Sequence, residues 1–219
     1  MDHVFARAPK QSRSRQSYDR MLDAAAEIID TGGLQALTLS AVSRRSKVSI
    51  GSIYCRVDGK DALLRAVQAR TLAQMDHEFA LMLTRVRRKE LPLRQLMPVM
   101  VRELALYLRR HAGLLGAFMQ HAPSDPVIEA AGRKSWLQNA LDYKLMLLER
   151  RVEFRHPDPG HAAEMCFTVT YGCLARFLGL GSSGVNEGNW TSLIEDLGMM
   201  TLAFVALDLE TATRSSARG

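Results

Sequence analysis

The sequence predicts an all-α protein. Apolar residues recur with helical spacing in almost every stretch between glycine and proline breakers, and Leu22, Ala25, Ala26 and Ile29 illustrate the pattern at i, i+3, i+4 and i+7. No stretch shows the strict alternation of a half-buried strand. We count nine helical segments in 219 residues, a length that suits one large domain or two small ones.

The helical segments follow one another between recognisable breakers. The first ends at Gly32-Gly33, because two glycines weaken a helix and favour its C-terminal cap. Pro98 lies inside the fifth, so that helix either begins or bends there. The remaining predicted segments span residues 40–46, 49–55, 58–91, 93–111, 113–121, 125–154, 162–180 and 190–204.

Composition excludes several classes of protein. Hydrophobic residues make up 47% of the chain, enough for a folded core. Three cysteines are too few for a disulfide framework and indicate a reducing compartment. The N-terminus lacks the apolar run of a secretory signal, and no stretch approaches the roughly 20 apolar residues of a membrane helix. We therefore expect a soluble, cytoplasmic protein.

The net charge of +6 is unevenly distributed. Residues 1–60 hold ten Lys and Arg against six acids, whereas residues 61–219 are close to balanced. We predict a flexible basic arm over residues 1–17, in which Arg13 and Arg15 are candidate DNA contacts. A solvated tail without function is the alternative.

The most informative segment is 37–64. It reads as two short helices joined by a tight turn and followed by a long helix, which is the helix-turn-helix layout. Val42, Val48 and Ile53 are spaced to pack the two short helices together, and Ser49 can cap the second. A recognition helix reads base edges with its first residues, so the second short helix predicts a DNA-binding surface.

These residues resemble the tetracycline-repressor (TetR) family of transcriptional regulators. The resemblance covers about residues 20–64 and rests on Gly33, Thr38, Val42, the segment 46–54, Val57, Lys60, Leu63 and Leu64. It implies a nine-helix, two-domain regulator: a helix-turn-helix domain over 18–59, a ligand-binding and dimerisation domain over 60–212, and a frayed tail over 213–219. The segment 111–115 resembles, more weakly, the start of the family's sixth helix.

The resemblance implies roles for individual residues. Thr38 and Ser40 would contact phosphate, Ile50, Gly51 and Ser52 would face bases, and Tyr54, Arg56 and Lys60 would clamp the DNA backbone. With the cap residue, the turn residue and the arm, the predicted DNA-binding set is Thr38, Ser40, Lys47, Ser49, Ile50, Gly51, Ser52, Tyr54, Arg56, Lys60, Arg13 and Arg15.

Lys47 departs from the family pattern, which has Gly in the turn between the two short helices. A side chain in the left-handed conformation costs about 1 kcal/mol. The turn is therefore either strained or differently shaped, and Lys47 either reaches a phosphate or is solvated.

The resemblance implies a ligand cavity among the middle helices, where a set of Met, aromatic and polar residues either packs the core or lines that cavity. Methionine-rich walls suit a bulky apolar or amphipathic effector. The predicted ligand residues are Met75, Phe79, Met82, Met100, Leu104, Tyr107, Phe118, Trp136, Asn139 and Tyr143.

The last two helices are expected to pair with their copies in a homodimer, as a four-helix interface. The predicted interface residues are Val169, Cys173, Phe177, Trp190, Leu197, Met200 and Phe204.

The remaining sequence motifs are less informative about function. The segment 179–184 matches G-x-G-x-x-G but follows a helical pattern instead of a strand, which disfavours a dinucleotide site. The histidines lack metal-ligand spacing, and no nucleophile has a partner, so we predict no metal, no cofactor and no enzyme. The prediction is a repressor released from a palindromic operator by a small effector. An activator, a regulator without a ligand, and an all-α enzyme or cofactor-binding protein are the alternatives.

Overall fold

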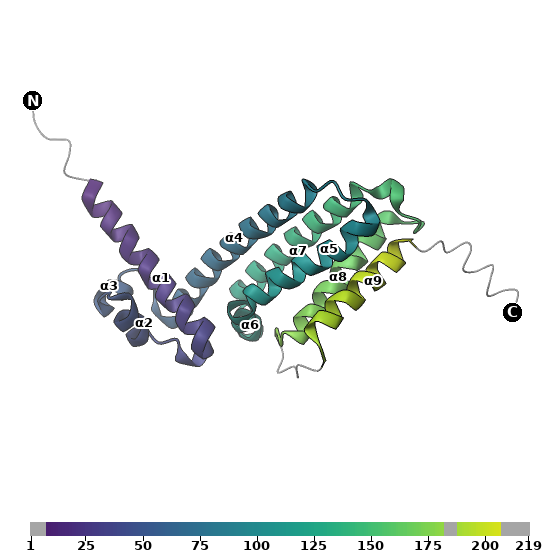
Figure 1. Cartoon of the computed structure of the whole chain (residues 1–219). Coiled ribbons are helices and arrows are strands. Elements are labelled where there is room, and N and C mark those ends of the chain that lie inside the picture. The colour runs from purple at the N-terminus through teal and green to yellow at the C-terminus, as the bar shows by residue number, and fades with distance from the viewer. Residues whose placement is uncertain (1–7, 182–187, 207–219) are drawn as a thin grey trace, which may run out of the picture. The chain divides into compact units, whose positions relative to one another are not determined.

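The computed structural model describes residues 8–181 and 188–206, with side chains from residue 14 onward. Nine α-helices and two 3-10 turns make up this described part, with no strand, which confirms the predicted all-α class (Figure 1). The helices are α1 (Ala8–Ala36), α2 (Leu39–Ser46), α3 (Ile50–Tyr54), α4 (Gly59–Arg87), α5 (Leu93–Arg110), α6 (Ala112–His121), α7 (Pro126–Leu148), α8 (Pro159–Phe177) and α9 (Trp190–Ala206), and the turns are η1 (Ala122–Ser124) and η2 (Arg151–Glu153).

The chain folds into two compact units that are not contiguous in sequence. Unit 1 contains the chain up to Leu72 together with Gly113–Glu129, and unit 2 contains Ala73–Ala112 and the chain from Ala130. The sequence analysis placed a single boundary near residue 60. The difference arises because the first apolar residues of α4 and those of α6 pack into the same core as α1–α3.

Unit 1 is organised around one hydrophobic core. Met21, Ile29, Leu37, Val42 and Ile53 are almost completely buried in it. Leu63, Leu64 and Val67 of α4 join them, as do Ala117 and Phe118 of α6 and Ile128 of α7. The predicted packing of Val42, Val48 and Ile53 between the two short helices is therefore confirmed.

Helix α1 starts earlier than the sequence predicts and breaks where it predicts. It begins at Ala8, so residues 8–17 are helical where a flexible arm was predicted. The segment lacks Gly and has Pro9 in its first turn, where proline is well tolerated. The regular helix breaks at Gly33, whose φ of 67° and ψ of −176° leave the helical region. The predicted end at Gly32-Gly33 is thus confirmed, whereas residues 1–7 lie outside the described residues.

Unit 2 is a bundle built from the second part of α4, α5, most of α7, α8 and α9. Helix α9 packs along α5 and α8 (Figure 1). At the α5–α9 contact, a Cβ atom on Gly198 would lie 3.2 Å from the Cα and Cβ atoms of Pro98. Close helix packing therefore favours glycine there, and α5 continues through Pro98 instead of starting at it. No helix in the described part of the chain is long and apolar enough to cross a membrane.

Candidate nucleic-acid interface and effector site

The turn between α2 and α3 is strained at one residue and well bonded around it. Lys47 adopts φ 58° and ψ 28°, the left-handed conformation, so of the two alternatives left open by the sequence the strained turn is the one observed. Ser46 Oγ accepts a hydrogen bond from Val48 N at 3.2 Å, and Ser43 Oγ donates to the Val48 carbonyl at 2.7 Å. These two serine hydroxyls hold the backbone in a geometry that lysine by itself disfavours.

Two of the predicted DNA-contacting hydroxyls cap helices. Thr38 Oγ1 accepts from Ala41 N at 3.1 Å at the start of α2. Ser49 Oγ accepts from Ser52 N at 3.3 Å at the start of α3, which confirms Ser49 as the cap, and the Ser49 and Ser52 hydroxyls lie 2.8 Å apart. These contacts orient the first turn of each helix and leave hydroxyl capacity for an outside partner.

Helix α3 has one buried and one exposed face. Ile53 is fully buried in the core of unit 1, whereas Ile50 is 44% exposed and Tyr54 is 58% exposed. Gly51 and Ser52 are also exposed. A Cβ atom added at Gly51 would meet nothing within 4 Å, so the fold of unit 1 does not require glycine there. The residues predicted to face bases thus lie together on the exposed face of α3, and Ser40 and Lys47 of the same helix-turn-helix are exposed as well.

Arg56 and Lys60 are engaged inside unit 1. The Arg56 guanidinium donates to Ser17 Oγ at 2.7 Å and to the carbonyl and hydroxyl oxygens of Ser14 at 3.2 and 3.3 Å. Lys60 Nζ donates to the Leu34 carbonyl at 2.8 Å. Both side chains therefore position α1, a role that the sequence reading missed because the partners lie 26 or more residues away. Exposed Arg44 on α2 was not among the predicted contacts, and Arg15 is exposed as well.

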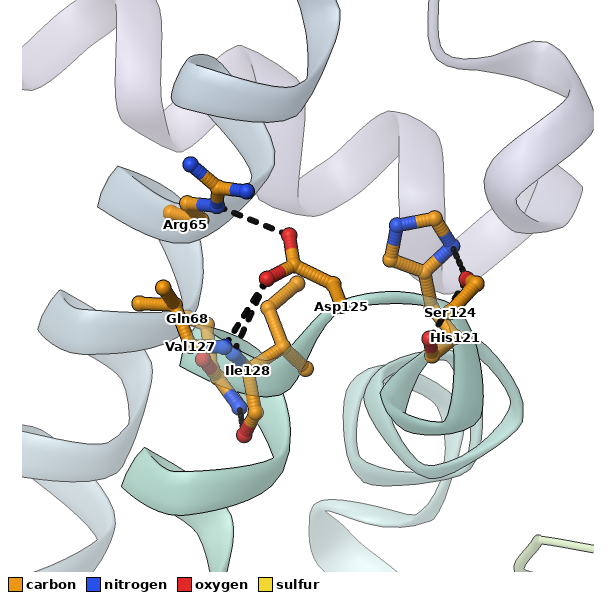
Figure 2. Close-up of polar contacts among 7 residues, drawn as sticks. All are labelled: Arg65, Gln68, His121, Ser124, Asp125, Val127 and Ile128. Atoms are coloured by element: carbon orange, nitrogen blue, oxygen red, sulfur yellow. Dashed lines mark hydrogen bonds and ion pairs between the residues drawn. The ribbon is translucent and has the colours of Figure 1, made fainter.

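The start of α7 is fastened to α4 within unit 1, as Figure 2 shows. Asp125 is only 3% exposed, and its carboxylate accepts from Arg65 Nε at 2.7 Å and from the backbone N–H groups of Val127 and Ile128 at 3.0 and 3.4 Å. Gln68 Nε2 donates to the Ile128 carbonyl at 2.9 Å. The Arg65 hydrogen bond holds the pKa of Asp125 below its usual value, with help from the two backbone donors. Asp125 thus caps α7 and pairs with α4 at once.

A polar group lies between α4 and α7 in unit 2. The Asp76 carboxylate accepts from Ser135 Oγ at 2.6 Å and from Asn139 Nδ2 at 3.3 Å. Ser135 and Asn139 are both buried, and Asp76 is half-buried. Sequence periodicity singled out Asn139 but neither Asp76 nor Ser135, because a charged residue in a helical pattern is usually solvated.

Three buried hydroxyls of unit 2 lack a hydrogen-bond partner in the described part of the chain. They belong to Tyr107 on α5, Tyr143 on α7 and Thr170 on α8. Burial raises the pKa of Tyr107 and of Tyr143 above the ordinary tyrosine value, and the carboxylate of Asp76 adds to the rise at Tyr107. An unpaired buried hydroxyl costs about 1–3 kcal/mol, so three of them in unit 2 call for an explanation.

Aromatic rings lie next to these hydroxyls. The ring centroid of Phe167 is 5.3 Å from that of Tyr143, 5.8 Å from that of Trp136 and 5.7 Å from that of Tyr171. Phe79 and Tyr107 form a second, edge-to-face pair at 5.2 Å. Phe167 and Tyr171 were not among the predicted ligand residues.

The structure divides the predicted ligand residues between the two units. Phe118 belongs to the core of unit 1, so we leave it out of the candidate effector site. The other nine lie in unit 2, where all but Trp136 are buried. Both core packing and an enclosed ligand site require burial, so burial alone cannot distinguish them. The unpaired hydroxyls and Asp76 are the features that favour a ligand site.

The predicted dimer residues also divide. Val169, Cys173 and Met200 are exposed, and Met200 is 61% exposed. Phe177 and Trp190 are half-buried, with ring centroids 5.2 Å apart, and half-buried Phe204 lies against His156. Leu197 is 2% exposed and packs inside the protomer, so it is not free to pair with a second copy. Of the two cysteines on α8, Cys166 is buried and Cys173 is exposed.

The fold and the site define a class: an all-α protein with a helix-turn-helix unit and a separate helical bundle. The family model described as "Bacterial regulatory proteins, tetR family" matches residues 21–67, which include α2, α3 and the start of α4. This match places the helix-turn-helix segment of the chain in the tetR family of bacterial regulatory proteins.

A curated relative and several solved structures are similar to the chain. The A-factor receptor protein of Streptomyces griseus is 30% identical over 69 residues, 32% of this chain, and the chain spans about a quarter (25%) of that relative's length. A structure from Mesorhizobium loti, assigned to the TetR-family transcriptional regulators, superposes with a TM-score of 0.73 at 16% sequence identity. The superposition covers 89% of this chain and 97% of the Mesorhizobium loti chain. The multidrug binding protein EbrR, complexed with imidazole, gives 0.61 at 19% identity over 88% and 96% of the two chains. At these identities the structures support the fold alone.

Proposed function

We propose that the protein is a homodimeric transcriptional repressor that binds a palindromic operator through α3 and releases it when a small effector binds in unit 2. The observation that carries the DNA-binding part is the open face of α3, where Ile50, Gly51, Ser52 and Tyr54 are exposed on a helix whose other face is buried. A helix held by its inner face and exposed at its first residues is the geometry that a major groove accepts.

Gly51 favours a close partner at this face. Glycine inside a helix costs about 1 kcal/mol relative to alanine, and nothing in unit 1 requires its small size. A glycine that the fold does not need is explained by a surface that must approach DNA closely. Lys47 and Arg44 are exposed beside it and supply charge for phosphate contacts.

The Gly51→Ala variant tests the proposal. We expect its melting temperature to equal or exceed that of the wild type, because alanine is the better helix former, while affinity for the DNA upstream of its own gene falls about tenfold or more. Fluorescence anisotropy with a labelled upstream fragment, against a scrambled fragment of the same length, measures the loss. Wild-type affinity in a folded Gly51→Ala protein would contradict the assignment of α3.

The effector site is proposed among α4, α5, α7 and α8 of unit 2. Tyr107, Tyr143 and Thr170 each offer a buried hydroxyl without a partner, and Trp136, Phe167 and Tyr171 supply aromatic surface beside them. A ligand with polar groups would satisfy hydroxyls that the protein alone leaves unpaired. Two similar proteins, the A-factor receptor protein and the multidrug binding protein EbrR, have names that refer to ligand binding. These names agree with an effector site in unit 2.

Release from DNA is proposed to pass through α4 and α7, which contribute residues to both units. Helix α4 carries Arg65 in unit 1 and Asp76 in unit 2, and α7 starts beside Asp125 and carries Asn139 in unit 2. An effector that shifts α4 against α7 therefore acts on two helices that also hold unit 1 together. The shift lowers DNA affinity only to the extent that the effector binds the released state more tightly.

The dimer is proposed to form through the exposed faces of α8 and α9. Val169, Gly172 and Cys173 on α8 and Met199 and Met200 on α9 are exposed, small or apolar, and uncharged. Burying such a surface against a second copy with two-fold symmetry would bring together two copies of α3, as a palindromic operator requires.

A further inference from the structure

We propose that the effector is an organic cation, an ammonium or similar group on an aromatic or apolar body, and that Asp76 receives its charge. The inference rests on the effector site proposed above and adds the chemical class of its ligand. It stands on three features of unit 2: a carboxylate with neutral partners, an unpaired hydroxyl beside it, and aromatic rings nearby.

Asp76 is a charge without a countercharge. Its partners in the described part of the chain are the neutral groups of Ser135 and Asn139, at 2.6 and 3.3 Å. Glu78, two residues further along α4, differs: its carboxylate lies 2.9 Å from His111 Nε2 and 3.6 Å from Arg110. A half-buried carboxylate normally has a cation, because desolvation disfavours its charge. A cationic ligand would supply the countercharge that these two neutral partners do not.

Tyr107 marks where the ligand's polar end would lie. Its side chain is 9% exposed, and its hydroxyl has no hydrogen-bond partner among the described residues. Its ring packs edge-on against Phe79, with 5.2 Å between the ring centroids, and Phe79 follows Asp76 by one turn on the same face of α4, so Tyr107 lies on the side of α4 that carries the acid. The Asp76 carboxylate also contributes to the raised pKa of Tyr107, after burial. An ammonium group between them would donate to both the carboxylate and the phenolic oxygen.

The aromatic rings suit the rest of such a ligand. Trp136 follows Ser135 directly on α7 and is half-buried, with its ring centroid 6.2 Å from that of Tyr171 in an edge-on arrangement. Indole and phenol faces attract cations and stack on flat apolar groups. An effector that carries a carboxylate would instead meet the charge of Asp76, whose two neutral donors are already in use.

Two probes of the same shape and opposite charge test the inference. 1-Naphthylmethylammonium and 1-naphthylacetate share one ring system and differ in the sign of their charge. Calorimetric titration of the full chain should show the cation binding roughly ten- to a hundredfold more tightly than the anion. Asp76→Asn keeps an oxygen to accept from Ser135 and should remove most of that preference.

The control is Glu164→Gln, which removes the same charge from an exposed position on α8, where Glu164 pairs with Lys144 at 2.9 Å. It should leave the preference unchanged, and an equal loss in both variants would reduce the effect to general electrostatics and overturn the proposal. Anion binding as tight as cation binding in the wild type, or binding of neither probe, overturns it as well, whether or not Asp76→Asn folds. Operator binding measured without either probe tests the proposed DNA-binding function separately. If the protein binds DNA but shows no preference for the cation, only the proposed class of effector is refuted.

Discussion

A single residue, Lys47, shows how the recognition unit tolerates strain. It sits in the left-handed conformation between α2 and α3, where the family pattern has glycine. The backbone cost of about 1–2 kcal/mol exceeds the roughly 0.4–1 kcal/mol of extra freedom that glycine brings to the unfolded chain. The backbone strain of Lys47 is therefore larger than the entropic cost of a glycine at this position. The hydrogen bonds of Ser43 and Ser46 hold the turn in place despite the strain.

We predict that Lys47→Gly raises the free energy of unfolding by roughly 0.5–1 kcal/mol, measured by urea denaturation. Lys47→Ala is the matched variant, because it removes the same charge but keeps the Cβ atom. It should leave stability unchanged or slightly lower. If both variants stabilise equally, the charge of Lys47 and not its backbone conformation is the cause. Operator affinity of Lys47→Ala then reports whether the side chain also contacts phosphate.

At the scale of the element, the carboxylate of Asp125 at the start of α7 has two structural roles. Asp125 caps the helix through Val127 and Ile128 and pairs with Arg65 of α4 (Figure 2). Because its pKa is lowered in the folded protein, it contributes stability above the pKa of the unfolded chain, and this contribution is lost as pH falls through the lowered folded value. The contact between α4 and α7 is therefore sensitive to acid.

We predict that Asp125→Asn lowers the melting temperature at neutral pH and that this difference from the wild type shrinks as pH falls below the ordinary aspartate value of 3.8 and disappears below the lowered pKa of the folded protein. Asparagine keeps the capping oxygen and removes the charge, so the difference isolates the pair with Arg65. Circular dichroism melts over this pH range measure it. Arg65→Met should cost about as much as the double variant, and additive losses would show that the two residues act separately.

At the scale of the molecule, the proposed regulator needs two copies of unit 1, and the faces that would join them lie on α8 and α9. We predict that Met200→Glu converts the dimer to a monomer, because it places a charge on a face that must be desolvated. Sedimentation velocity measures the change. Leu137→Glu is the control: Leu137 is 54% exposed on α7, outside the proposed interface, and its variant should stay dimeric. A dimeric Met200→Glu protein would place the interface elsewhere.

The limits of sequence reasoning follow the distance between contacting residues. The helix-turn-helix could be predicted because Val42, Val48, Ile53 and the cap at Ser49 act within about a dozen residues. The roles of Arg56 and Lys60 could not, because their partners lie on α1, up to 42 residues away. Helical periodicity marked Phe118 and Leu197 as apolar but could not say against which surface they pack.

The sequence by itself determined the class of this protein: helices from periodicity, helix ends from Gly33 and Ser49, and the family from residues on one short segment. Only the tertiary structure decided which helices share a core, that α6 belongs with unit 1, and that Asp76 meets the neutral side chains of Ser135 and Asn139. The reason is physical. Local conformation depends on neighbouring residues, whereas burial and the balance of charges depend on elements that only folding brings into contact.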